Sequence, residues 1–173
     1  MVKYMSKSLY EYCKENDREE LLRQWDTERN AGKTPKEISS GSSMMVWWHC
    51  DRGHSFPMRI ALRTTREQGC PYCTGRRVLV GYNDLATVAP KIAAEWHPTL
   101  NGEQTAQMVT AGSSKPIWWR CRQGHVWRTR VDVRAGPQHS GCPICAGNFQ
   151  KSSMHRMERP QITKMRHCNE ESP

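Results

Sequence analysis

Two clusters of cysteine and histidine with almost identical spacing constrain this chain more than any other feature. The first has the pattern C-x3-H-x15-C-x2-C and the second has the pattern C-x3-H-x16-C-x2-C. Three thiolates and one imidazole match the number and type of ligands that tetrahedral Zn2+ prefers, so we predict one zinc ion in each cluster. The predicted zinc ligands are Cys50, His54, Cys70 and Cys73 in the first cluster, and Cys121, His125, Cys142 and Cys145 in the second.

Both predicted metal sites are closed, because each has four protein ligands and no open position. A closed tetrahedral site is structural, so the two zinc ions are expected to supply folding free energy and not to activate water. The alternative is that these cysteines are simply buried or form disulfides. Six of the eight cysteines fall in the two clusters, each completed by a histidine that a disulfide framework does not need, which favours zinc.

The clusters belong to a duplicated unit of about 70 residues. A shift of 71 residues places Trp25 on Trp96 and the Trp47-Trp48 pair on Trp118-Trp119. The shift becomes 72 at the last two cysteines of each cluster, so the second copy has one extra residue before Cys142. We therefore divide the chain into a first module (residues 1–80), a second module (residues 81–150) and a flexible basic tail (residues 151–173).

The composition agrees with two small modules and not with one large core. Hydrophobic residues make up 36% of the chain, there are only two phenylalanines, and the mean hydropathy is −0.82. Modules this small usually need additional stabilisation, for example by a bound metal ion. We identify no signal peptide and no apolar stretch of membrane-spanning length, so a soluble protein in a reducing, intracellular compartment such as the cytoplasm is expected.

Each module is expected to begin with short helices. Residues 8–25 carry an apolar stripe, Ser8 and Glu11 form a capping box, and Asn16-Asp17 is a possible break. In the second module, Asp84 caps a weak turn and Pro90 suits the start of a short helix over 91–96.

A zinc-bound hairpin is expected to follow in each module. The alternation of apolar and polar residues over 56–63 predicts that its second strand continues to residue 63. The C-x2-C pair is then expected to enter a short helix.

The two tryptophan pairs are candidates for contact with a ligand. Adjacent residues of a strand face opposite sides, so one ring of each pair can cover the core while the other faces outward. An exposed tryptophan beside arginines is a platform on which a base can stack, and we assign this role to Trp48 and Trp119. The alternative is that both rings pack around the zinc site.

Arginines supply the main functional signal. Residues 49–80 contain 6 basic and 2 acidic side chains, residues 118–150 contain 5 and 1, and all eleven basic residues are arginines. Guanidinium groups bind phosphate in a bidentate manner, and the repeated placement favours phosphate contact, although a solvated basic face remains the alternative for any single arginine. The candidate nucleic-acid contacts are Arg59, Arg63, Arg66, Arg76 and Arg77 in the first module, and Arg120, Arg122, Arg128, Arg130 and Arg134 in the second.

Both copies contain the strings WW-x-C-x2-GH-x-[FW] and GCP-x-C-x-G, and the second copy also contains EWHPTLNG and GSSKPIWW. Together these strings resemble a zinc-ribbon repeat of bacterial, phage and some eukaryotic proteins. That family is similar to the treble-clef class of zinc fingers, and its members carry the repeat in tandem. The resemblance implies nucleic-acid binding. Some relatives carry the repeat beside an endonuclease domain, for which this chain has no visible counterpart.

The sequence thus predicts a small α+β fold with two tandem treble-clef or zinc-ribbon modules. Each is expected to have a short helix, a zinc-bound hairpin and a short C-terminal helix. The predicted function is non-enzymatic binding of nucleic acid, DNA ahead of RNA. The alternatives are an adaptor that docks a partner protein such as a nuclease, and, with less support, a treble-clef metal nuclease.

Overall fold

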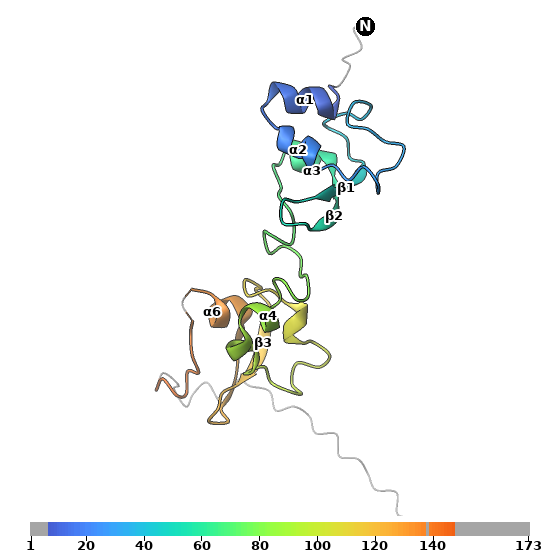
Figure 1. The fold of residues 1–173 in the computed structure, drawn as a ribbon. Helices are drawn as coiled ribbons and strands as arrows, with labels where there is room; N and C mark the ends of the chain where they lie inside the picture. The colour runs from blue at the N-terminus through green and yellow to red at the C-terminus, as the bar shows by residue number, and fades with distance from the viewer. Residues whose placement is uncertain (1–6, 138, 148–173) are drawn as a thin grey trace, which may run out of the picture.

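The computed structural model describes residues 7–137 and 139–147. These residues form two modules, each built around its own two-stranded antiparallel sheet, with neither helix nor strand over residues 65–84 between them (Figure 1). Among the described residues, no helix has both the length and the apolar character needed to cross a membrane. The predicted tail, residues 151–173, lies outside the described residues.

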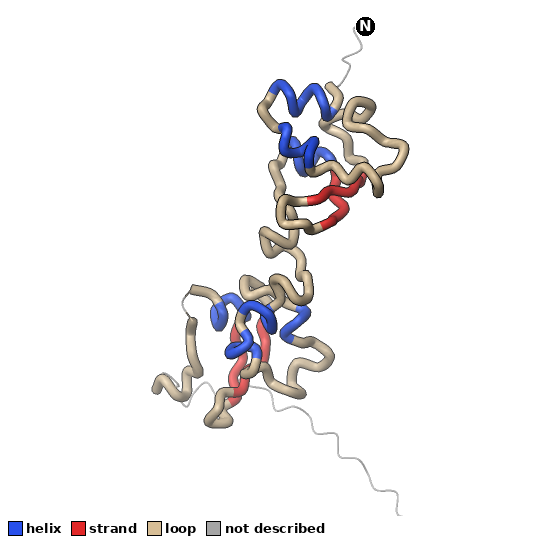
Figure 2. Tube along the Cα trace, viewed as in Figure 1, coloured by secondary structure: helices blue, strands red, loops and turns tan. Residues whose placement is uncertain are grey.

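Both modules contain two short helices, then a hairpin and then a further short helix, and the second module adds a 3-10 helix before its hairpin (Figure 2). The first module contains α1 (Leu9–Glu15), α2 (Glu19–Arg23), β1 (Met45–His49), β2 (Ser55–Arg59) and α3 (Ile60–Thr64). The second module contains α4 (Leu85–Val88), α5 (Pro90–Ala93), the 3-10 helix η1 (Ala106–Met108), β3 (Pro116–Arg120), β4 (Val126–Arg130) and α6 (Val131–Ala135).

The N-terminal helices begin where the capping residues predict. The Ser8 side chain accepts a hydrogen bond from the Glu11 backbone N–H and the Glu11 carboxylate accepts one from the Ser8 backbone N–H, which confirms the capping box. The predicted break is real, because Asp17 has a φ of 54° and separates α1 from α2. Asp84 caps α4 and Pro90 is the first residue of α5, as predicted.

The second strand of each hairpin is shorter than the alternation predicts. Arg59 pairs with Met45, the first residue of β1, so residues beyond Arg59 have no partner strand to continue with. The chain instead turns into α3, and the corresponding segment of the second module turns into α6. Within α3, residues Ile60, Arg63 and Thr64 form one buried face at helical spacing. The prediction that the strand continues to residue 63 is therefore wrong, and Arg59 and Arg63 do not share one strand face.

Each module has its own core, with an edge-to-face pair of tryptophans in it. Trp25 packs against Trp48 at a ring centroid distance of 5.6 Å and an interplanar angle of 84°, and Trp96 packs against Trp119 at 5.6 Å and 76°. The two sets of buried apolar residues share no member. Each module therefore has the internal packing of an independent unit.

Trp48 and Trp119 are fully buried, so their predicted role as exposed stacking platforms is wrong. The hairpin register explains the burial, since Trp48 lies opposite Phe56 and Trp119 lies opposite Trp127, and all four side chains are buried. The indole N–H of Trp48 donates to the Met58 carbonyl at 3.1 Å, and the indole N–H of Trp119 donates to the Thr129 carbonyl at 3.0 Å.

The helix expected after C-x2-C is a hydrogen-bonded turn in both modules. In the first, the backbone N–H of Thr74 donates to the Cys70 carbonyl at 3.0 Å and that of Gly75 donates to Tyr72 at 3.2 Å. Gly75 then adopts a φ of 70°, a left-handed conformation that ends a helical turn, and Gly147 does the same in the second module.

Candidate metal centres and basic surface

The first two ligands of each cluster come from the tight turn that joins the hairpin strands. In the first module the backbone N–H of Cys50 donates to the His54 carbonyl at 3.0 Å, and that of Gly53 donates to the Cys50 carbonyl at 2.8 Å. Gly53 has a φ of 80° and Gly124, at the same place in the second module, has a φ of 81°. Only glycine adopts this conformation at low cost, which accounts for the GH dipeptide in both copies.

The remaining two ligands come from the turn after α3 or α6, which returns to the hairpin. In the first cluster, Nδ1 of His54 lies 3.3 Å from Sγ of both Cys50 and Cys73 and 3.7 Å from Sγ of Cys70. Sγ of Cys50 and Sγ of Cys73 are 3.8 Å apart. The ligand nitrogen is thus Nδ1 and not Nε2.

The second cluster repeats this geometry. Nδ1 of His125 lies 3.5 Å from Sγ of Cys121, 3.2 Å from Sγ of Cys145 and 3.7 Å from Sγ of Cys142, and the sulfurs of Cys121 and Cys145 are 3.8 Å apart. A tetrahedral zinc ion with Zn–S of ~2.3 Å and Zn–N of ~2.0 Å requires S–S separations of ~3.8 Å and S–N separations of ~3.5 Å. Both clusters fit one structural zinc ion each.

The thiols of each cluster differ in how readily they ionise. Burial opposes ionisation of Cys50 and Cys121, but two backbone N–H groups of the hairpin turn, together with hydrogen bonds from the neighbouring cysteines, outweigh it in each case and lower the pKa of both thiols. Burial raises the pKa of Cys70 and of Cys145 to about 11, and at Cys145 the neighbouring thiol groups add to it. A bound zinc ion supplies the positive charge that keeps all three thiols ionised.

Tyr82, a residue that the sequence pattern did not single out, covers the first cluster. Its ring packs edge-on against His54 at a centroid distance of 4.2 Å, and its hydroxyl lies 3.9 Å from Sγ of Cys73. The Arg52 side chain donates to the same hydroxyl at 2.8 Å. Tyr82 follows the first module in sequence, so comparison of the two copies gave no signal for it.

One family model matches two separate segments of the chain, residues 21–76 and 92–148, and is described as "Probable Treble clef zinc finger domain". The chain belongs to this family. Each matched segment holds one complete set of zinc ligands and one hairpin, so the two treble-clef zinc fingers are arranged in tandem. A search of curated proteins found no match.

Most of the predicted arginine contacts lie on the surface of the two zinc fingers. Eight of the ten are exposed, and seven of these eight form no ion pair with any described carboxylate. The exposed side chains are Arg59, Arg66, Arg76, Arg77, Arg120, Arg122, Arg128 and Arg130.

Arg63 is a structural residue and not a surface contact, contrary to the prediction. Only 5% of it is exposed, and its guanidinium carbon lies 4.9 Å from the centroid of the Trp48 ring. It also donates a hydrogen bond to the Gln24 side chain. Burial lowers the pKa of Arg63, and nearby Arg18 lowers it further.

Arg134 occupies the equivalent place in the second zinc finger and is also held internally. Its Nε and Nη2 atoms donate to one Glu95 oxygen at 3.0 Å and 2.6 Å, and its side chain is 11% exposed. The helix that replaces the predicted strand turns Arg134 away from Arg130, which is exposed and pairs with Asp132.

The outward rings of the tryptophan pairs are Trp47 and Trp118, which are half-buried. The guanidinium of Arg29 lies 4.5 Å from the centroid of Trp47, and that of Arg128 lies 5.9 Å from the centroid of Trp118. Each ring thus already has a cationic neighbour, a contact of about 0.5–2 kcal/mol that a stacked base would have to replace.

Proposed function

We propose that this protein binds nucleic acid, DNA in preference to RNA, through exposed arginines on its two zinc fingers. The observation that carries the proposal is that seven of the ten predicted contact arginines are exposed and form no ion pair with a described carboxylate. A merely soluble surface mixes lysine with arginine and pairs its cations with acids, whereas a phosphate-binding surface keeps guanidinium groups free.

The arrangement of these arginines around a groove supports the proposal. Arg59, Arg76 and Arg77 line one groove of about 250 Å³ in the first zinc finger, whose walls also include Met45 and Pro57. Three guanidinium groups at one groove can contact successive phosphates of a strand. A guanidinium can also hydrogen-bond to the edge of guanine in the major groove of B-form DNA. The major groove of A-form RNA is too narrow for this contact, so the arginines favour DNA.

The proposed activity is binding without catalysis. Each zinc ion would have four protein ligands at tetrahedral spacing, so no position is left for a substrate or a reactive water. Zinc–thiolate sites of this kind are stable where thiols stay reduced, and we place the protein inside the cell on that ground.

Fluorescence anisotropy of a labelled DNA duplex, titrated with the zinc-loaded protein at several salt concentrations, tests the proposal. If about five to seven exposed cations contact phosphates, the plot of log K against log salt has a slope of about −4.5 to −6. The same titration with single-stranded DNA and with an RNA duplex ranks the three ligands. The control for net charge is R23E/K33D, because Arg23 and Lys33 are exposed cations that lie outside the groove of Arg59, Arg76 and Arg77.

A triple variant R59A/R76A/R77A should weaken binding and lower the magnitude of the slope by about 3, since each arginine contributes about one phosphate contact. The proposal is wrong if the zinc-loaded protein shows no binding at low salt. In that case the exposed side chains serve a protein partner, and the adaptor hypothesis gains support.

A further inference from the structure

The second zinc finger contains a basic groove between its N-terminal helix and its zinc-binding turn. The groove has a volume of about 780 Å³, and its charged lining residues are Lys91, Glu95, Arg120, Arg122 and Arg134. Lys91, Arg120 and Arg122 are exposed and form no ion pair with any described residue. With Arg134 held by Glu95, three free cations face this groove.

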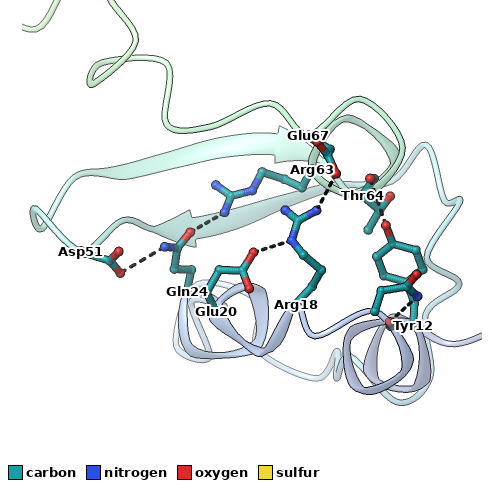
Figure 3. A network of polar contacts seen from close by, with 9 residues as sticks. Tyr12, Arg18, Glu20, Gln24, Asp51, Arg63, Thr64 and Glu67 are labelled. Carbon is teal, nitrogen blue, oxygen red and sulfur yellow. Dashed lines mark hydrogen bonds and ion pairs between the residues drawn. The ribbon is translucent and has the colours of Figure 1, made fainter.

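The first zinc finger has a groove at the same place, but it is smaller and internally neutralised. Its volume is about 340 Å³, and Figure 3 shows the network of polar contacts across it. Arg18 donates to Glu20 at 2.5 Å and to Glu67 at 3.2 Å. Gln24 donates to Asp51 at 3.1 Å and accepts from Arg63.

The duplication allows the two grooves to be compared position by position. The 71-residue shift places Glu20 on Lys91 and Asp51 on Arg122, so two of the three acidic residues that line the first groove are replaced by cations in the second. Arg18, which bridges the two glutamates, aligns with Ala89. The charged side chains lining the first groove sum to zero, and those lining the second sum to +3.

We propose that the groove of the second zinc finger is the main phosphate-binding subsite of the protein, and that the equivalent groove of the first is closed to phosphate by its own ion pairs. The inference rests on the proposed function and deepens it, because it assigns the backbone contact to one module. A DNA strand laid in the groove brings its phosphates to Lys91, Arg120 and Arg122, which form no ion pair with a described carboxylate because the Glu95 of this groove is held by Arg134. In the first groove, a phosphate would meet Glu20, Asp51 and Glu67.

The test exchanges the groove charges for those of the other copy. The double variant K91E/R122D places in the second groove the residues that the first groove has at the same positions. Both side chains are exposed and make no described side-chain hydrogen bond or ion pair, so the fold should persist. The matched control is R23E/K33D, two exposed residues of the first zinc finger outside every described groove, which changes the net charge by the same amount.

Binding of both variants to a fluorescein-labelled DNA duplex is measured by anisotropy, with zinc content and thermal melting as folding controls. We expect K91E/R122D to bind at least about tenfold more weakly and to lower the salt slope by about 2, while R23E/K33D stays within about threefold of the wild type.

Three results would overturn the inference. If both double variants lose affinity equally, binding follows total charge and no groove is preferred. If K91E/R122D binds normally while R59A/R76A/R77A does not, the main subsite lies on the first zinc finger, and nucleic-acid binding itself still stands. If the wild-type protein fails to bind, the proposed function falls together with the subsite.

Discussion

Removing one zinc ligand from the second zinc finger should unfold that module and leave the other intact. Cys142→Ser replaces a buried thiol that lies 3.7 Å from Nδ1 of His125 and belongs to the tetrahedral set. The core of this module has seven buried hydrophobic residues, and Cys142 is one of them. A structural zinc ion contributes about 10 kcal/mol or more to folding, as much as the whole stability of about 5–15 kcal/mol of an ordinary domain.

The separation of the two cores decides how far the damage spreads. Because the buried clusters share no residue, loss of the second zinc ion leaves the packing around Trp25 and Trp48 in place. We therefore expect elemental analysis to give one zinc per chain for C142S and two for the wild type. The matched control is C13S, because Cys13 is buried in the first core but belongs to neither cluster.

Two-dimensional NMR of the tryptophan indole groups reads the modules separately, since the chain has seven tryptophans. In C142S the signals of the second module should collapse to unfolded positions, namely those of Trp96, Trp118, Trp119 and Trp127. The signals of Trp25, Trp47 and Trp48 should stay dispersed. If all seven signals collapse, or if the variant retains two zinc ions, the two modules do not fold independently with one stabilising zinc ion each.

Three further substitutions test the packing and the turn. Trp119→Ala should destabilise the second zinc finger by about 3–5 kcal/mol in denaturant titrations, because the ring is fully buried. Trp118→Ala should lower the stability clearly less, because that ring is only half-buried. Equal losses of stability in the two variants would contradict the hairpin register. Arg63→Ala should lower the melting temperature while Arg59→Ala should not, since only Arg63 packs on the core; a DNA-binding defect confined to Arg63→Ala would reverse these assignments. Gly53→Ala should lower the stability of the first zinc finger by about 1 kcal/mol or more and weaken its retention of zinc against a chelator, because a φ of 80° strains any residue other than glycine. Unchanged zinc retention would argue against the turn geometry.

The sequence predicts the metal sites well because their spacing carries a distance constraint. Four ligands must meet at one ion, so C-x3-H and C-x2-C restrict the backbone whatever surrounds them. The capping residues Ser8 and Asp84 also act through local hydrogen bonds, and their helices begin as predicted.

The assignments of Arg63, Trp48 and Trp119 as surface contacts are wrong because tertiary packing determines whether these side chains are buried. The segment from Ile60 to Thr64 satisfies both a strand period and a helical period, and the choice depends on where β1 begins, which no local pattern reveals. For the same reason the register that buries Trp48 is visible only once Phe56 is known to lie opposite it. The charge difference between the two grooves was present in the sequence, in the replacement of Glu20 by Lys91.

The most direct test of nucleic-acid binding through exposed arginines is the NMR spectrum of the arginine side-chain Nε–H groups during a titration with DNA. We predict that the signals of Arg120 and Arg122 shift most, that those of Arg59, Arg76 and Arg77 shift as well, and that the buried Arg63 does not respond. A spectrum in which no exposed arginine signal moves at low salt would contradict the account.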